Sequence, residues 1–393
     1  MADKENIVLN YGRYLAHLMA CSINKTTPTP PDFTLDWEML YRLATKHNVA
    51  VIITPCVLSL DAPQEIKAKF KYNSNIITAR EARQEIEAQR VFAAFVKADI
   101  PFIKLKGIVL KNLFPQPYMR THCDVDICVS EDDRERAKAV MAELGYNLEC
   151  SIDYHDEYIK DTYFIFEIHS CVMSPRSHLF PLFDEPFKKS RVSEFPPGLQ
   201  FENEYFYLSL FVHMYKHFVS EGCGIRLLCD LYVFEKAYPQ MDFEMIKSSL
   251  AQYNLQEFFD NVYALCHNLF DGGEFDYKQE VIAEFILRSG EYGNPELKKL
   301  SWLSSDRSAN LRTKDKIRYL MGNWFPSAKN FSRKYPVLKK APILLPLCWI
   351  HRALYTVFKK RDALSQQQEE IKKLNSDALK VAKRIRHIAG IKE

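Results

Sequence analysis

A pair of carboxylates in the middle of the chain has the spacing of a metal-binding site. Asp124 and Asp126 stand two residues apart in HCDVDICVS, a run with the alternation of a β-strand. Side chains two apart in a strand share a face, so both carboxylates point one way while Val125 and Ile127 point into the core. Adjacent carboxylates repel each other unless a cation lies between them. Oxygen ligands of this kind suit Mg²⁺ or Mn²⁺, which also accompany nucleotide phosphates.

A third acid, Glu167, interrupts the apolar, strand-like run YFIFEIHSCV. If this strand lies beside the strand of Asp124 and Asp126, the three carboxylates form one cluster. Such a cluster can hold two metal ions about 3.5–4 Å apart, the arrangement used for in-line phosphoryl displacement. One ion lowers the pKa of an attacking hydroxyl, and the other neutralises a leaving pyrophosphate. The alternative for Glu167 is an acid at a strand edge that faces water.

The elements around these acids predict a small mixed sheet. PFIKLKG alternates like a strand, and Gly107 then begins a short helix, IVLKNLF. The Asp124 strand is followed by EDDRERAKAVMAELGY, a helix whose first turn is acidic and therefore suits the helix dipole. Two more strand-like runs follow, YNLECSI and YFIFEIHSCV. This β-α-β-α-β-β order, over about 75 residues, predicts a mixed sheet with helices on one face.

The rest of the chain is predicted to be helical. Only 12 of the 393 residues are glycine, which favours long helices over turn-rich β architectures. The expected fold class is α+β and predominantly helical, with a small mixed-sheet core flanked by helical regions. RVSEFPPGLQ is predicted to be a proline-rich linker. The expected divisions are an N-terminal helical region at 1–98, the α/β core at 99–185, a helical domain packing on the core at 186–297 and a basic helical region at 298–393.

The net charge of +3 hides a strong asymmetry. From Ser301 to the end, 21 Lys and Arg stand against 7 Asp and Glu. This excess predicts either an anionic partner, such as a nucleic acid or a membrane surface, or a solvated helical face. No stretch approaches the ~20 apolar residues of a membrane span. The N-terminus does not have the pattern of a secretory signal and the ten cysteines include no C-x-x-C pair, so we expect reduced thiols and a cytoplasmic location.

Together these motifs resemble the uncharacterised nucleotidyltransferase family of bacterial proteins, within the polymerase-β-type nucleotidyltransferase superfamily. The resemblance covers roughly residues 30 to 350 of the chain. It is carried by LKG, R-x-x-x-D-x-D, E-x-H and H-x-x-x-H…R-x-x-x-D at Leu105, Lys106, Gly107, Arg120, Asp124, Asp126, Glu167, His169, His213, His217, Arg226 and Asp230.

The resemblance implies a metal-dependent transfer of a nucleoside monophosphate from an NTP, such as ATP, to an acceptor hydroxyl or phosphate. Pyrophosphate would be released. Asp124 and Asp126 would bind both metals, and Glu167 would bind the catalytic one. The residues implied to lie near the nucleotide or the acceptor are Lys106, Gly107, Arg120, His217 and Arg226.

Some motif positions depart from the family pattern or have a plainer interpretation. The superfamily turn usually reads Gly-Ser or Gly-Gly, whereas this chain has Gly107-Ile108. We therefore expect the triphosphate to contact the backbone amides after Gly107, aided by Lys106. Arg120 either clamps phosphate or pairs with an aspartate. Arg226 and Asp230, at i and i+4, either form an ion pair within their helix or face the cleft.

Two other function classes share these residues. A non-catalytic module on the same fold would hold a nucleotide or a protein partner without turnover. The unusual Gly107-Ile108 turn and the basic C-terminal region favour that class. A metal-dependent phosphodiesterase would use the same three acids without an NTP. The acceptor is not predicted, because acceptor pockets are built from loops and helices that carry no readable code.

Overall fold

The structure, a computed structural model, divides the chain into two units. The first comprises Met1–Gly293 with Ile388–Lys392, and the second comprises Asn294–His387 with Glu393. The predicted four-part division of the chain stays a prediction. The described residues are 2–152, 154–161, 164–294, 297, 325, 331, 335–339, 341–359 and 376–392.

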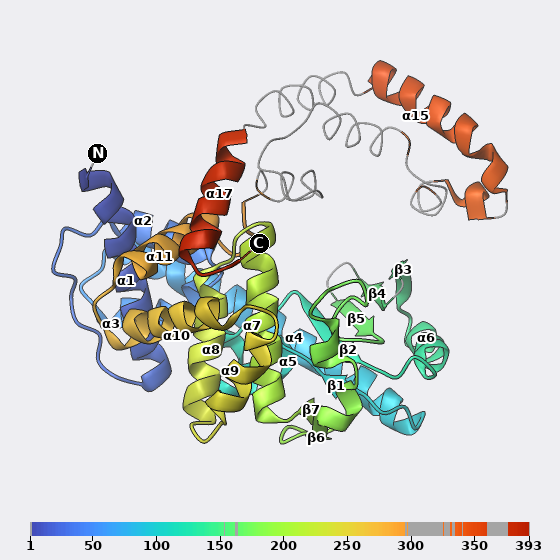
Figure 1. Ribbon diagram of the computed structural model, residues 1–393, viewed down its shortest axis with the longest axis horizontal. Coiled ribbons are helices and arrows are strands. Elements are labelled where there is room, and N and C mark those ends of the chain that lie inside the picture. Colours follow the sequence, from blue (N-terminus) through green and yellow to red (C-terminus); the bar gives the residue numbers. More distant parts are fainter. Residues whose placement is uncertain are drawn as a thin grey trace. The chain divides into compact units, whose positions relative to one another are not determined.

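A seven-stranded mixed sheet lies in the first unit, with the strand order β3-β4-β5-β2-β1-β7-β6 (Figure 1). Strands β2 and β5 are parallel, as are β1 and β7, and the other neighbours are antiparallel. The predicted α+β, predominantly helical fold class is confirmed. The strands are β1 Ile103–Lys104, β2 Asp124–Cys128, β3 Asn147–Ile152, β4 His155–Lys160, β5 Phe164–His169, β6 Ser190–Val192 and β7 Leu199–Phe201.

The pairing of β2 with β5 brings the acidic strands together. Asp126 is the register partner of Glu167, and Cys128 is the partner of His169. Register partners in adjacent strands share a face of the sheet, and that face repeats every second residue. Asp124, Asp126, Glu167 and His169 therefore lie on one face. The expectation that the Glu167 strand neighbours the Asp124 strand is confirmed.

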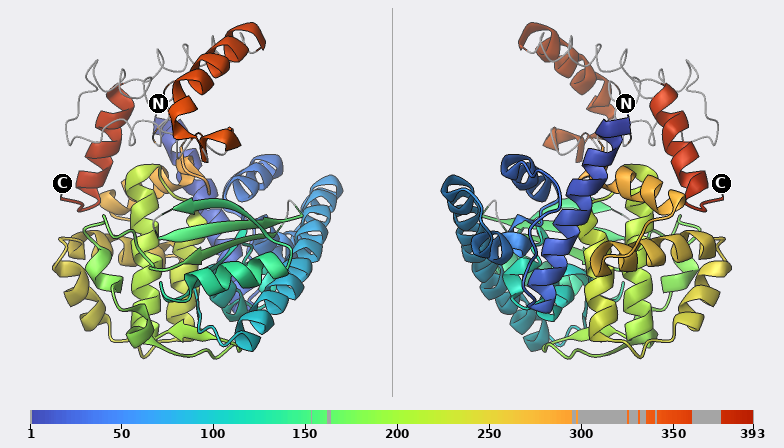
Figure 2. Two further views of the ribbon diagram at one scale, coloured as in Figure 1. Left: turned by 90° about the vertical axis from the view of Figure 1, so that its right-hand side faces the viewer. Right: turned by 90° about the vertical axis from the view of Figure 1, so that its left-hand side faces the viewer.

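The opposite face of these strands is apolar and is covered by α4 (Gln64–Lys97) and α6 (Arg134–Glu143), which run alongside the strands in Figure 2. The Phe166 ring lies 6.4 Å from the Phe92 ring of α4 and 5.5 Å from the Tyr146 ring that follows α6. Burying a side chain such as Phe166 contributes about 1.5–3 kcal/mol. This packing fixes which face of the sheet the acids occupy.

Three strands were missed by the sequence prediction. β4 lies between β3 and β5, but its sequence HDEYIK is mostly polar, and its buried Asp156 is paired with Arg134 at 2.8 Å. Strands β6 and β7 form a hairpin that includes RVSEFPPGLQ and one residue on each side of it, so the linker prediction for that segment was wrong. Each of these two strands has three residues, and the prolines between them gave the segment the composition of a loop.

The helices predicted before and after the sheet region of the sequence are confirmed. Helix α1 packs against α3, α10 and α11, so helices from the two ends of the first unit lie together (Figure 1). Asp36 caps α2 by accepting from Glu38 N at 2.9 Å. The remaining helices of this unit are α1 Ala2–Asn24, α2 Trp37–Lys46, α3 Ala50–Ser59, α5 Gly107–Leu110, α7 Asn203–Ser220, α8 Ile225–Ala237, α9 Phe243–Ala251, α10 Gln256–Asp271 and α11 Tyr277–Ser289.

The described part of the second unit contains α15 (Leu345–Lys359) and most of α17 (Ser376–Ile388). A small apolar cluster is formed there by Phe331, Leu338 and Cys348. Much of the predicted basic region lies outside the described residues, so its anionic partner stays a prediction. Within the described ranges, no helix has both the length and the apolar character to traverse a bilayer. All ten cysteines are free thiols.

Candidate active site

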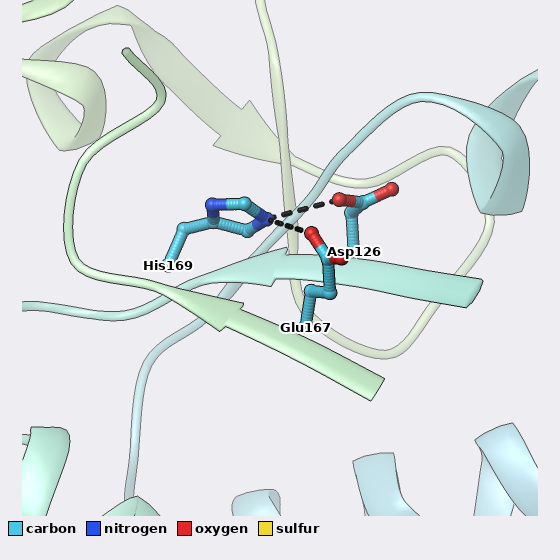
Figure 3. A group of neighbouring side chains, drawn as sticks. All are labelled: Asp126, Glu167 and His169. Carbon is cyan, nitrogen blue, oxygen red and sulfur yellow. Dashed lines mark hydrogen bonds and ion pairs between the residues drawn. The ribbon is translucent and has the colours of Figure 1, made fainter. Parts of the chain in front are cut away.

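Asp126, Glu167 and His169 form a close group on the polar face of the sheet (Figure 3). His169 Nε2 lies 2.9 Å from Asp126 Oδ1 and 3.4 Å from Glu167 Oε2. Asp126 and His169 are buried, and Glu167 is partly buried. Within the described residues, this is the group of acids and histidines close enough together to hold one metal ion.

Lys106 approaches the same carboxylate from the turn after β1. Its Nζ lies 2.9 Å from Asp126 Oδ1, and the neighbouring Leu105 N donates to Asp126 O at 3.1 Å. The backbone of Lys106 has a φ of 48°, a left-handed conformation that is sparsely populated by non-glycine residues. Such a conformation costs about 1–3 kcal/mol and persists where its surroundings enforce it. The contacts with Asp126 hold this turn against β2 and place the ammonium group beside the carboxylates.

The charges in this group stabilise one another. Burial alone would raise the pKa of Asp126, but the Lys106 ammonium and the hydrogen bond from His169 hold it well below its usual range. The hydrogen bond from His169 also lowers the pKa of Glu167. Burial would lower the pKa of His169, but its bonds to the two carboxylates raise it. Asp124 differs, because burial and the charge of Asp126 raise its pKa to about 6.

A pocket of about 370 Å³ opens onto this group. Its volume falls in the range of small-molecule sites, roughly 300–1,000 Å³. Lys216 of α7 lines the wall of the pocket with an accessible side chain. Partial desolvation of its ammonium by the surrounding protein, together with the charge of Lys106, lowers the pKa of Lys216. The two ammonium groups suit a polyanionic ligand. The polar residues that line the pocket include Lys106, Glu167, His169, Ser209, His213 and Lys216, and the apolar ones include Val172, Met173, Leu179 and Phe183.

Gly107 begins α5 at a point of close approach between two segments. A Cβ atom on this residue would lie 3.1 Å from His122 Cβ, so a side chain would push against the segment that leads into β2. Helix α5 has four residues, and the amides of Val109 and Leu110 already donate to Lys106 O at 3.1 Å. At most the amides of Gly107 and Ile108 are therefore left to contact a phosphate in this turn.

Arg120 and Arg226 belong to a second group of charges, which we call the closed cluster: Arg120, Asp230, Arg226 and Glu291. Arg120 donates to both carboxylate oxygens of Asp230, at 2.6 and 2.7 Å, and both side chains are buried. Arg226 pairs with Glu291 and donates to Thr121 O at 2.7 Å. The predicted ion pair between Arg226 and Asp230 is therefore wrong. Of the two interpretations of Arg120, the structure shows the pairing with an aspartate.

Helix α7 presents a different histidine to the pocket from the one predicted. His213 lines the pocket, whereas His217, one turn later, has its Nδ1 2.8 Å from Glu221 Oε1. A role for His217 near the nucleotide stays a prediction. Sequence reasoning assigned no role to Lys216 or His213, because most of α7 is apolar and its periodicity does not say which side faces the sheet. His169 was named only as part of the E-x-H motif, although its position two residues from Glu167 in one strand already predicts that both side chains share a face.

A comparison with protein families defines the class of this protein. Residues 34–271 match the profile of a family described as uncharacterised nucleotidyltransferase. The match spans more than half of the chain, which therefore belongs to this family, as the motifs predicted. A comparison with curated proteins gives no match.

Two solved structures of the antibiotic-resistance factor ANT(2'')-Ia are similar to part of the chain. Its solution structure is 13% identical, with a TM-score of 0.35, and the match covers 48% of this chain and 97% of that one. Its crystal structure in complex with adenylyl-2''-tobramycin is 13% identical, with a TM-score of 0.34, and the match covers 44% of this chain and 97% of that one. Each of the two structural alignments covers less than half of this chain.

Proposed function

We propose that this protein moves a nucleoside monophosphate from an NTP to an acceptor hydroxyl or phosphate, with a divalent metal ion and with release of pyrophosphate. Membership of the family gives the nucleotidyltransferase class. The observation that carries the finer proposal is the register of β2 and β5, which sets Asp126 beside Glu167 next to an open pocket. Lys106 and Lys216 line the same pocket and supply positive charge for a triphosphate.

The side chains on this face fit a divalent cation. Asp126 and Glu167 each offer an oxygen in one close group, and Asp124 lies on the same face of β2. By the family pattern, Asp124 and Asp126 would bind two ions and Glu167 the catalytic one, with Mg²⁺ or Mn²⁺ as the ions. A bound ion would polarise the attacking hydroxyl and offset the charge of the phosphates.

The chain's own residues divide the remaining work. The acceptor oxygen attacks the α-phosphorus in line and forms the new P–O bond. The bond from the α-phosphorus to the oxygen that bridges to the β-phosphate breaks, and pyrophosphate leaves with that electron pair. When the acceptor is a hydroxyl, Glu167 takes its proton, since the lowered pKa keeps this carboxylate ionised at neutral pH. Lys106 and Lys216 stabilise the charge that develops on the phosphates.

The proposal is tested by pyrophosphate release from each NTP in the presence of Mg²⁺ or Mn²⁺ and a panel of acceptors. The panel contains sugar phosphates, aminoglycosides, peptides and RNA ends. Wild-type protein should release pyrophosphate, and Asp126→Asn should not. Glu157→Gln is the matched control, because Glu157 is the β4 register partner of Glu167 but lies outside the close group. It should keep the activity.

Two results would replace this proposal with another class. Tight NTP binding that needs no divalent metal and survives both Asp124→Asn and Asp126→Asn would favour a non-catalytic module. Calorimetric titration measures that binding directly. Cleavage of a phosphodiester in the absence of NTP would favour a phosphodiesterase that uses the same acids.

A further inference from the structure

We propose that His169 is a direct ligand of the metal ion, so that the site combines carboxylate oxygens with an imidazole nitrogen and prefers Mn²⁺ to Mg²⁺. The inference rests on the proposed function for the presence of a metal. It goes further by naming a nitrogen ligand and an ion that a site of three acids does not require. The ion is the catalytic one of the proposed function, and Asp126, Glu167 and His169 form the close group that would hold it, with Asp124 on the same face.

The distances within the group match those between ligands of one ion. Two donors that bind an ion at right angles, each through a bond of about 2.1 Å, lie roughly 3.0 Å apart. His169 Nε2 lies 2.9 Å from Asp126 Oδ1 and 3.4 Å from Glu167 Oε2. Figure 3 shows this nitrogen facing both carboxylates. An ion between the three donors would need only small movements of these side chains, and it would replace the Lys106 ammonium, whose Nζ lies 2.9 Å from the same Asp126 Oδ1.

The backbone pairing of β5 holds His169 in this orientation. Val129 N donates to His169 O at 2.9 Å, which extends the pairing of β2 and β5. On the other side, His155 of β4 is its register partner, and the two ring centroids are 5.3 Å apart. A ligand built on a paired strand is positioned more precisely than one on a loop.

The imidazole of His169 makes its polar contacts only toward the carboxylates. Its side chain is 9% exposed, and Nδ1 is buried with no hydrogen-bond partner among the described residues. Burial of a polar ring is unfavourable unless its nitrogen atoms have partners. Here the contacts of Nε2 with Asp126 and Glu167 offset that cost. The ring is therefore held beside the two carboxylates.

The nitrogen ligand sets the expected choice of ion. Mg²⁺ strongly prefers oxygen ligands and gives up its water reluctantly. Imidazole suits transition metals, and Mn²⁺ accepts carboxylates and nucleotide phosphates as well. Mn²⁺ should therefore bind about tenfold or more tightly than Mg²⁺ in the nucleotide-free protein, and His169 should account for that preference.

The test detects the nitrogen directly. Mn²⁺ is added to the full-length protein without nucleotide, and electron spin echo envelope modulation records the nitrogen nuclei bound to the ion. We expect the ¹⁴N pattern of a coordinated imidazole, replaced by the ¹⁵N pattern in protein that contains ¹⁵N-histidine. His169→Gln should remove the pattern and weaken Mn²⁺ binding about tenfold or more. His155→Gln, which changes the neighbouring ring on the same face, should keep the pattern.

The outcomes separate this inference from the proposed function. Mn²⁺ bound to the wild-type protein without a nitrogen pattern would overturn the His169 ligand and leave a carboxylate-held metal in place. A pattern that persists in His169→Gln would also overturn it. The isotope-labelled wild-type protein shows whether a histidine nitrogen binds the ion, and the comparison of His169→Gln with His155→Gln assigns that nitrogen to His169. Failure of the nucleotide-free protein to bind Mn²⁺ would overturn the His169 ligand alone, because an ion can still arrive with the NTP. Pyrophosphate release that persists after addition of a chelator would overturn the metal dependence.

Discussion

Two groups of charged side chains in the first unit differ in what they face. In the closed cluster, two arginines are matched by two carboxylates, Asp230 and Glu291. In the open group, Asp126, Glu167, His169 and Lys106 lie beside a pocket. A buried pair that is fully matched has no charge left for a ligand, whereas the open group retains carboxylate oxygens and an ammonium group at a cavity. This difference separates residues that maintain the fold from residues available for chemistry.

The comparison predicts that Asp126→Asn affects activity far more than stability. We expect the rate of pyrophosphate release to fall roughly a thousandfold, since the variant removes a carboxylate that acts on the transition state. The free energy of unfolding should fall less than in Arg120→Met, because the Lys106 ammonium left without its partner is partly exposed beside the pocket and can be solvated. Steady-state kinetics and urea denaturation measure the two quantities. An inactive variant that is also severely destabilised would place Asp126 with the structural charges.

The reverse is expected for Arg120→Met. Loss of the guanidinium leaves the carboxylate of Asp230 buried without its partner, which should lower the free energy of unfolding by about 3–5 kcal/mol. The double variant Arg120→Met, Asp230→Leu should recover most of that loss, because the uncompensated charge is removed. Equilibrium urea denaturation checks both. A stable Arg120→Met protein with a raised KM for NTP would contradict the structural role assigned to the closed cluster, because Arg120 would then be a nucleotide ligand.

Lys216→Ala should have an intermediate effect, which concerns nucleotide binding in the pocket and not stability. Removing this ammonium from the pocket wall should raise the KM for NTP about tenfold, equivalent to about 1.4 kcal/mol. Stability should not change, because the side chain is exposed. Lys97→Ala, at the end of α4, is the control for loss of an exposed lysine elsewhere. Equal KM values for the two variants would argue against a phosphate contact at Lys216.

The smallest expected effect concerns a histidine that belongs to neither group. Hydrogen bonds to Glu235 and Asp271 raise the pKa of His267 above its usual value of 6.5. The stabilisation is therefore fully present below about pH 6.5 and is lost as the pH rises through the higher folded-state pKa. His267→Gln should lower the Tm slightly at pH 6 and less at higher pH. Thermal melts of the wild-type protein and the variant from pH 6 upwards measure this difference in Tm. The difference must be known before any pH dependence of stability is assigned to the open group.

Sequence periodicity predicted the open group better than the closed cluster, for a physical reason. The alternation of side chains in a strand is local, so it placed Asp124 and Asp126 on one face before the neighbouring strand was known. The partner of Arg120 is 110 residues away, and that of Arg226 is 65 residues away. No local pattern contains such pairings. Arg120 and Arg226 were therefore predicted as nucleotide-binding from motif alone, and the structure places both in ion pairs.

The sheet was predicted less completely than the helices for a related reason. Long amphipathic or apolar segments identify helices by themselves, whereas a strand acquires its partners from the topology. β4 is too polar to show an apolar alternation, and β6 and β7 are too short. Lys216 was missed because the orientation of α7 depends on its packing against the rest of the protein. The strands with strong alternation and the order of the acids were predictable.

If a divalent ion binds as proposed, the parallel pairing of β2 with β5 also makes ion binding a measure of whether these strands have assembled. Asp126 and His169 are 43 positions apart in the chain, so an unfolded polypeptide cannot offer them together. An ion that binds only the folded form raises the free energy of unfolding by about 2.7 kcal/mol when present at a hundred times its Kd. Addition of a chelator should therefore lower the free energy of unfolding of the whole first unit rather than of one loop. A rise in Tm on addition of Mn²⁺ would show that these two strands are paired.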